Sequence, residues 1–107
     1  MAKVENESGV RITDQFRQRE AIVYDLKCDS IRISISISPE TTANETWKAD
    51  VVAKMMPDRP SVSAVGQSRS EALGALEEAW CEKGETGGLP ALDWKAIRQA
   101  LVAVRAI

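Results

Sequence analysis

The sequence predicts an α+β fold: an antiparallel sheet of about four strands with two C-terminal helices packed on one face. The first observation is the segment 31–39, Ile-Arg-Ile-Ser-Ile-Ser-Ile-Ser-Pro, in which apolar and polar residues alternate strictly. Such alternation is typical of a strand with one buried and one solvated face. The second is that apolar residues after Ser68 recur with helical spacing. Strands followed by helices are typical of helices packed on one face of an antiparallel sheet.

Strand character is strongest between residues 21 and 65. The predicted strands are residues 21–26, 31–38, 47–55 and 61–65. The second of them is expected to end at Pro39, because proline cannot donate a hydrogen bond to a neighbouring strand. Residues 10–20 fit either a short strand or one or two helical turns, because the alternation of Val10 and Ile12 gives way to a charged run.

Two helices are predicted after the strands. Ser68 and Glu71 have the spacing of a capping box. The apolar face that follows comprises Ala72, Leu73, Ala75, Leu76, Ala79 and Trp80. Gly84 is placed to end this helix as a left-handed C′ residue. Asp93 is expected to cap the last helix, whose apolar stripe comprises Trp94, Ile97, Leu101 and Val104. Trp47, Trp80 and Trp94 are all predicted to lie in the core.

The chain is predicted to form one domain over residues 10–107, preceded by a mobile arm over residues 1–9. The arm lacks the apolar centre of a signal peptide, and no window approaches the roughly 18 apolar residues of a membrane span. Cys28 and Cys81 are far apart in the sequence, which favours buried free thiols in a reducing compartment. We therefore expect a cytoplasmic protein that does not bind membranes.

The residue inventory argues against catalysis. The chain of 107 residues contains no histidine, its two cysteines are isolated, and its glycines form no nucleotide-binding motif. We therefore expect no enzymatic activity, no cofactor and no metal site. The net charge of −2 lacks the excess of cations with which proteins neutralise phosphates, so nucleic acid is not an expected partner.

The candidate partner-binding residues are Arg32, Ser34, Ser36, Lys48, Lys54, Arg98, Val102 and Arg105. Those of the strands lie on the polar side of the sheet. This side is either ordinary solvated surface or a flat, weakly basic surface for another protein, and both interpretations stay open. The last helix is apolar around most of its circumference, which favours self-association and a homodimer.

Residues 56–80, Met-Pro-Asp-Arg-Pro-Ser-Val-Ser-Ala-Val-Gly-Gln-Ser-Arg-Ser-Glu-Ala-Leu-Gly-Ala-Leu-Glu-Glu-Ala-Trp, resemble the HicB-like antitoxin domain. The matching features are the prolines of the turn, Gly66 and Ser68 at the end of the short strand, and the helix start Glu71-Ala72-Leu73. With the strand before the turn, the resemblance covers residues 47–80. It implies a small non-enzymatic module that binds and blocks a partner protein.

The same region also resembles the double-stranded-RNA-binding domain, whose last strand and helix read Gly-x-Ser-Lys-Lys-x-Ala. Here Arg69 and Ser70 stand where that family has lysines, and the helix carries glutamates at 71, 77, 78 and 82. These differences count against RNA binding. A nucleic-acid-binding domain of this architecture is thus kept as the alternative, and the protein-interaction module is preferred.

Overall fold

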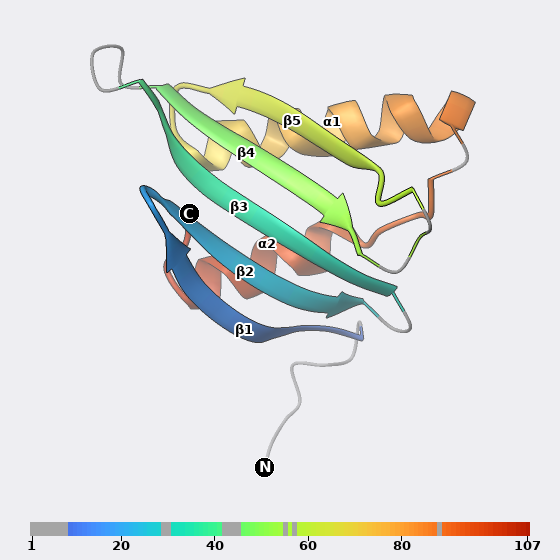
Figure 1. Cartoon of the computed structure of the whole chain (residues 1–107), viewed down its shortest axis with the longest axis horizontal. Coiled ribbons are helices and arrows are strands. Elements are labelled where there is room, and N and C mark those ends of the chain that lie inside the picture. The colour runs from blue at the N-terminus through green and yellow to red at the C-terminus, as the bar shows by residue number, and fades with distance from the viewer. Residues whose placement is uncertain (1–8, 29–30, 42–45, 55, 57, 88) are drawn as a thin grey trace.

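The computed structural model describes residues 9–28, 31–41, 46–54, 56, 58–87 and 89–107, and it has the predicted α+β architecture (Figure 1). The strands are β1 (Val10–Gln18), β2 (Ala21–Cys28), β3 (Ile31–Thr41), β4 (Thr46–Ala53) and β5 (Ser61–Gly66). The helices are α1 (Arg69–Gly87) and α2 (Trp94–Ala103). Apart from Gly9, the arm predicted over residues 1–9 lies outside the described residues.

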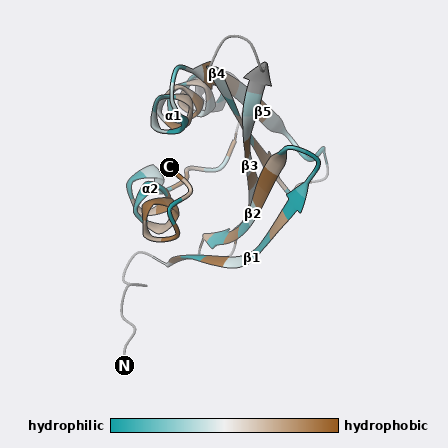
Figure 2. Cartoon of the chain, turned by 90° about the vertical axis from the view of Figure 1, so that its left-hand side faces the viewer, coloured by the Kyte–Doolittle hydropathy of each residue, from teal (hydrophilic) through white to brown (hydrophobic). Residues whose placement is uncertain are grey.

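Consecutive strands pair with one another, so the sheet is an antiparallel meander in the order β1-β2-β3-β4-β5. Both helices lie on one face of this sheet, which we call the covered face (Figure 2). The alternation of β3 has the predicted consequence. Ile33, Ile35 and Ile37 are at most 4% exposed, and Ile35 lies opposite Tyr24 of β2 and Val51 of β4. The serines between the isoleucines lie on the other side, which we call the open face.

Strand β1 resolves the ambiguity of residues 10–20 and brings the strand number to five, where the sequence predicted about four. Its pairing with β2 shifts register between Ile12 and Asp14. A bulge of this kind adds one residue, and the side chains after it change faces. Phe16 is therefore paired with Val23 on the open face, and Arg17 with Ile22 on the covered face.

Strand β3 does not end at Pro39, as predicted, but continues to Thr41. The register with β4 shifts between Pro39 and Thr41. An irregularity in the ladder tolerates a residue without an N–H, and this explains why the proline does not end the strand. The predicted end of the next strand at Met55 lies outside the described residues, and β4 ends at Ala53.

Helix α1 begins as its capping sequence predicts. The Glu71 amide donates to Ser68 Oγ at 3.1 Å, and the Gln67 amide donates to the Glu71 carboxylate at 3.1 Å. The prediction that Gly84 ends the helix is wrong, because α1 continues to Gly87. Among the described glycines only Gly9 has a positive φ, so Gly84 does not form the left-handed turn that was expected of it.

The two helices are joined through their tryptophans. Asp93 caps α2 by accepting a hydrogen bond from the Ala96 amide at 3.1 Å. Trp94 then packs edge-to-face against Trp80, with ring centroids 6.4 Å apart. The Trp80 indole N–H donates to the Pro90 carbonyl at 3.0 Å. Trp80 and Trp94 are buried as predicted, whereas Trp47 is only half-buried at the edge of the core.

The apolar stripe predicted for the last helix is shorter than expected. Val104 follows the helix as its C-cap and is 41% exposed. Arg105 then adopts a φ of 63°, with its amide donating to the Val102 carbonyl at 2.9 Å. The Ala106 amide donates to the Leu101 carbonyl at 2.8 Å. This pair of bonds is a Schellman motif, which turns the chain back so that Ala106 is buried.

The cysteines differ from their predicted burial. Cys28 is buried in β2 as a thiol, but Cys81 lies exposed on α1 because it falls outside the apolar face of that helix. None of the described helices is both long and apolar enough to span a membrane.

Candidate functional site

The predicted partner-binding residues fall into two groups on opposite layers of the molecule. Arg32, Ser34, Ser36 and Lys48 project from β3 and β4 on the open face, and Lys54, the residue after β4, joins them there. Arg98, Val102 and Arg105 belong to α2 or to the turn after it, on the far side of the sheet (Figure 2). The structure therefore brings the first group together and separates it from the second.

The carboxylate of Asp25 organises one half of the open face. Ser34 lies directly opposite Asp25 in the β2–β3 pair, and its Oγ donates to Asp25 Oδ1 at 2.5 Å. Lys54 Nζ lies 3.5 Å from the other carboxylate oxygen. Thr13, the residue at the β1 bulge, donates to the Asp25 carbonyl at 3.2 Å. One aspartate thus connects β1, β2 and β3 with the residue that follows β4.

Asp50 organises the other half of the open face, next to β5, by accepting hydrogen bonds from serines of both neighbouring strands. Ser36 lies opposite it in the β3–β4 pair and donates to Asp50 Oδ2 at 3.4 Å. Ser63 lies opposite it in the β4–β5 pair and donates to Oδ1. The serines are therefore not simply small residues that let a partner approach. Their hydroxyls are already bound to the carboxylates of Asp25 and Asp50, which holds these side chains in place.

Between these two networks the open face is hollowed. A cavity of about 290 Å³ lies over β1 to β4. It is lined by Phe16, Gln18, Val23, Ser34, Ser36, Val52, Lys54 and Arg59. Phe16 is 42% exposed, whereas Val23 is only 8% exposed although it faces away from the helices. The floor is therefore apolar, and the cationic side chains of Lys54 and Arg59 lie at one side of the hollow.

The sequence did not identify Phe16, Val23, Val52 or Arg59 as site residues. Val52 interrupts an otherwise polar side of its strand, which is a weak signal that was present in the alternation. Val23 belongs to a strand with apolar residues on both faces. Phe16 reaches the open face only because of the bulge after Ile12, and no local pattern predicts that change of face.

On the helical layer, two of the predicted partner-binding residues, Arg98 and Arg105, contribute to the structure of the domain itself. Arg98 of α2 donates to the Ser70 hydroxyl at 2.8 Å and to the Ser70 carbonyl at 3.3 Å, so it holds α2 against α1. Arg105 forms the left-handed turn that ends α2. Val102 is 53% exposed, and it is the predicted residue of this layer that offers free apolar surface.

The described residues contain no group of three or more histidine, cysteine, aspartate or glutamate side chains that could hold a metal ion. A comparison of the chain with protein-family models, curated proteins and solved structures finds no match to any of them. The interpretation of the open face therefore depends on its own geometry.

Proposed function

We propose that this chain is a protein-interaction domain that binds another protein through the open face of its sheet. The observation that supports the proposal most directly is the hollow with the apolar floor of Phe16, Val23 and Val52. Protein interfaces characteristically place a buried aromatic or aliphatic anchor in such a depression, with polar groups around it.

Two serines of the hollow already have hydrogen-bond partners within the sheet. The hydroxyls of Ser34 and Ser36 donate to Asp25 and Asp50 within the sheet. Side chains that are already fixed lose little conformational entropy on association, and this lowers the cost of binding. A hollow bordered by fixed side chains is therefore well suited to a partner whose own surface supplies one protruding apolar residue.

The charges suggest the character of that partner. Lys54 and Arg59 border the hollow, while Arg32 and Lys48 lie farther along the same face. The cations Arg32, Lys48, Lys54 and Arg59 of this face outnumber the carboxylates of Asp14, Asp25 and Asp50. The face therefore carries a small excess of positive charge. Complementary charge speeds association and excludes wrong partners. The proposed partner presents an apolar side chain flanked by acidic residues.

An antitoxin of the HicB-like type, which blocks the protein that it binds, remains a prediction within this proposal. The strand, turn, short strand and capped helix on which the resemblance was based are present as β4, β5 and α1. The proposed contact surface extends beyond the resemblance, because Phe16 and Val23 lie outside residues 47–80. A role in binding nucleic acid is less favoured, since Phe16 is the one aromatic side chain of the hollow and aspartates stand beside it.

The test is affinity capture from the native cell with matched variants. Phe16→Glu and Lys54→Glu should each abolish the capture of a stoichiometric protein partner. Lys95→Glu makes the same charge change on an exposed lysine of α2 and should leave the capture unchanged. Circular dichroism verifies that all variants fold. If the Lys54 and Lys95 variants capture the same proteins as the wild type, or if only nucleic acid is captured, the proposal is wrong.

A further inference from the structure

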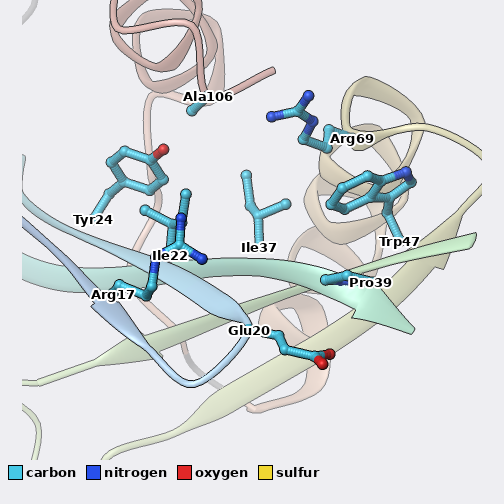
Figure 3. Close-up of a pocket in the computed structure, with 9 residues that line it drawn as sticks. All are labelled: Arg17, Glu20, Ile22, Tyr24, Ile37, Pro39, Trp47, Arg69 and Ala106. Carbon is cyan, nitrogen blue, oxygen red and sulfur yellow. The ribbon is translucent and has the colours of Figure 1, made fainter. Parts of the chain in front are cut away.

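A second cavity lies on the covered face, between the β1–β2 turn and the N-terminus of α1 (Figure 3). Its volume is about 210 Å³. It is lined by Arg17, Glu20, Ile22, Tyr24, Ile37, Pro39, Trp47, Arg69 and Ala106. These residues come from β1 to β4, the β1–β2 turn, α1 and the chain after α2. The proposed function of the open face does not explain why they lie together.

Two guanidinium groups border this cavity without an acidic partner. Within the described part of the chain, neither Arg17 nor Arg69 forms an ion pair or a hydrogen bond through its side chain. Arg69 lies over the ring of Trp47, 4.9 Å from its centroid, so its guanidinium is held in place by a cation–π contact. Glu20, the acidic group of the lining, belongs to the exposed turn between β1 and β2.

Tyr24 adds a hydrogen-bond donor to the same space. The residue is only 3% exposed, and Figure 3 shows its hydroxyl directed toward the region between Ala106, Ile37 and Arg69. No described residue accepts or donates a hydrogen bond at this hydroxyl, and the oxygen itself is not fully buried. The hydroxyl is therefore an accessible donor at the edge of the cavity, available to an acceptor that comes from outside the chain.

The remaining walls include apolar side chains on two sides. Ile22 and Ile37 lie on one side, and the half-buried indole of Trp47 lies on the other, next to Pro39 and Arg69 (Figure 3). Small-molecule sites commonly combine apolar walls with a few convergent polar groups. A volume of about 210 Å³ suits a compound of one ring, because a cavity of roughly 150 Å³ is enough for benzene.

We infer that this cavity binds a small organic carboxylate with a flat apolar body, of the size of benzoate. The carboxylate would accept hydrogen bonds from Arg69, Arg17 and the Tyr24 hydroxyl, because guanidinium groups pair with carboxylates through two parallel bonds. The apolar body would lie between the isoleucines and Trp47. This site is on the opposite layer from the open face, so its test is independent of the proposed protein partner.

The experiment is a titration of the full chain with benzoate, followed by the NMR signal of the Trp47 indole N–H. The expected result is saturable binding with a Kd of about 1 mM or tighter, which is ordinary for so small a ligand. Arg69→Gln and Arg17→Gln should each weaken binding about tenfold. Arg32→Gln removes the same charge from the open face and should leave the Kd unchanged. Benzamide, which has the same ring without the charge, should bind at least tenfold more weakly than benzoate.

Three results would overturn the inference. The first is a wild-type titration that does not saturate at about 10 mM benzoate, well above the Kd expected for a specific site. The second is an equal loss of affinity in the Arg69 and Arg32 variants, which would show that only net charge matters. The third is binding of inorganic phosphate as tight as that of benzoate, which would remove the role assigned to the apolar walls.

Discussion

Ser34 Oγ donates to Asp25 Oδ1 at 2.5 Å across the β2–β3 pair, and this contact distinguishes two serines that the sequence makes equivalent. Ser34 and Ser38 both lie on the open face of β3. Ser34 is opposite a carboxylate, whereas Ser38 is opposite Lys48 in the β3–β4 pair. An aspartate introduced at position 34 would therefore lie opposite a carboxylate, whereas one introduced at position 38 would lie opposite a lysine.

Ser34→Asp is expected to destabilise the domain by roughly 1–2 kcal/mol, because it removes a hydrogen bond and places like charges on directly opposite residues. Ser38→Asp should be neutral or slightly stabilising, since its new carboxylate lies opposite Lys48. Urea unfolding of the two variants gives the comparison. Equal midpoints would mean that the Asp25 contact contributes nothing to stability.

Gly66 is required at the end of β5 by the close approach of α1. A Cβ added at Gly66 would lie 2.4 Å from the Ala72 amide nitrogen and 2.6 Å from the Glu71 carbonyl carbon, both backbone atoms that cannot move aside easily. Gly66→Ala should therefore destabilise the domain by about 1–3 kcal/mol. Chemical denaturation of the variant measures this cost.

Gly74 is the matched control within α1. A Cβ there would meet only the end of the Arg98 side chain, at 3.4 Å. Gly74→Ala should raise stability by about 0.5–1 kcal/mol, because alanine favours the helical conformation more than glycine does. A Gly66 variant as stable as the wild type would show that β5 and α1 are not packed this closely.

Arg105 has an unfavourable backbone conformation for a residue with a side chain. It occupies the left-handed position of the Schellman motif with a φ of 63°. Glycine takes this conformation without the cost of about 1 kcal/mol that other residues pay. Arg105→Gly should therefore be more stable than Arg105→Ala by roughly that amount. Both variants lose the same charge, so thermal unfolding of the pair isolates the backbone effect, and equal stabilities would contradict it.

Tyr24 predicts a specific dependence of stability on pH. Burial raises the pKa of Tyr24 above its ordinary value of 10.0, although the nearby Arg69 guanidinium opposes this effect. The folded state therefore keeps the phenolic proton at a pH where the unfolded chain loses it. This contribution to stability is complete below about pH 10 and falls as the pH rises through the folded-state pKa.

Urea midpoints measured from about pH 8 to about pH 11 should fall more steeply for the wild type than for Tyr24→Phe, which has no phenol to ionise. The chain has a single tyrosine, so tyrosinate absorbance also reports its titration directly. Parallel pH profiles for the two proteins would show that the hydroxyl is solvated as in the unfolded chain.

Sequence reasoning succeeded where the pattern of a single segment decides the structure. The isoleucines of β3 are buried because period-two alternation assigns one face to the core, whatever the neighbouring strands are. Ser68 and Asp93 cap their helices because a cap depends only on residues a few positions away. The fold class followed from the order of these elements.

Sequence reasoning failed where two segments together determine which face or contact a residue has. The face of Phe16 depends on a bulge that forms between β1 and β2, and the bonding of Ser34 depends on the register that places Asp25 opposite it. The cavity beside Trp47 is completed by Ala106, which returns to the core through a left-handed arginine. A left-handed turn of this kind is normally indicated by a glycine, and here the position is occupied by Arg105.

The helical layer retains an exposed apolar strip that the domain does not bury. Val102 is 53% exposed and Val104 is 41% exposed, and Ala103 between them is exposed as well. We predict that two copies of the chain associate through this strip. A closed two-fold contact uses the same patch on both subunits, so the strip of one copy would meet the same strip of the other.

The edges of the sheet offer a second route to a dimer. Strand β1, the edge that contacts α2, carries charged residues and a bulge, both of which discourage pairing with another strand. Strand β5, Ser-Val-Ser-Ala-Val-Gly, has neither, and its Val65 is 47% exposed. Val65→Lys is therefore the variant that separates pairing through the edge of β5 from pairing through the end of α2.

Light scattering of the three proteins decides between these arrangements. We expect the wild type to be a dimer, the double variant Val102→Lys with Ala103→Glu to be a folded monomer, and Val65→Lys to remain a dimer. The opposite response of the two variants would place the contact at β5 and show that the strip on α2 is ordinary surface. A wild type that stays monomeric at high concentration would contradict self-association altogether, and would leave the exposed valines of α2 to a contact with a different protein.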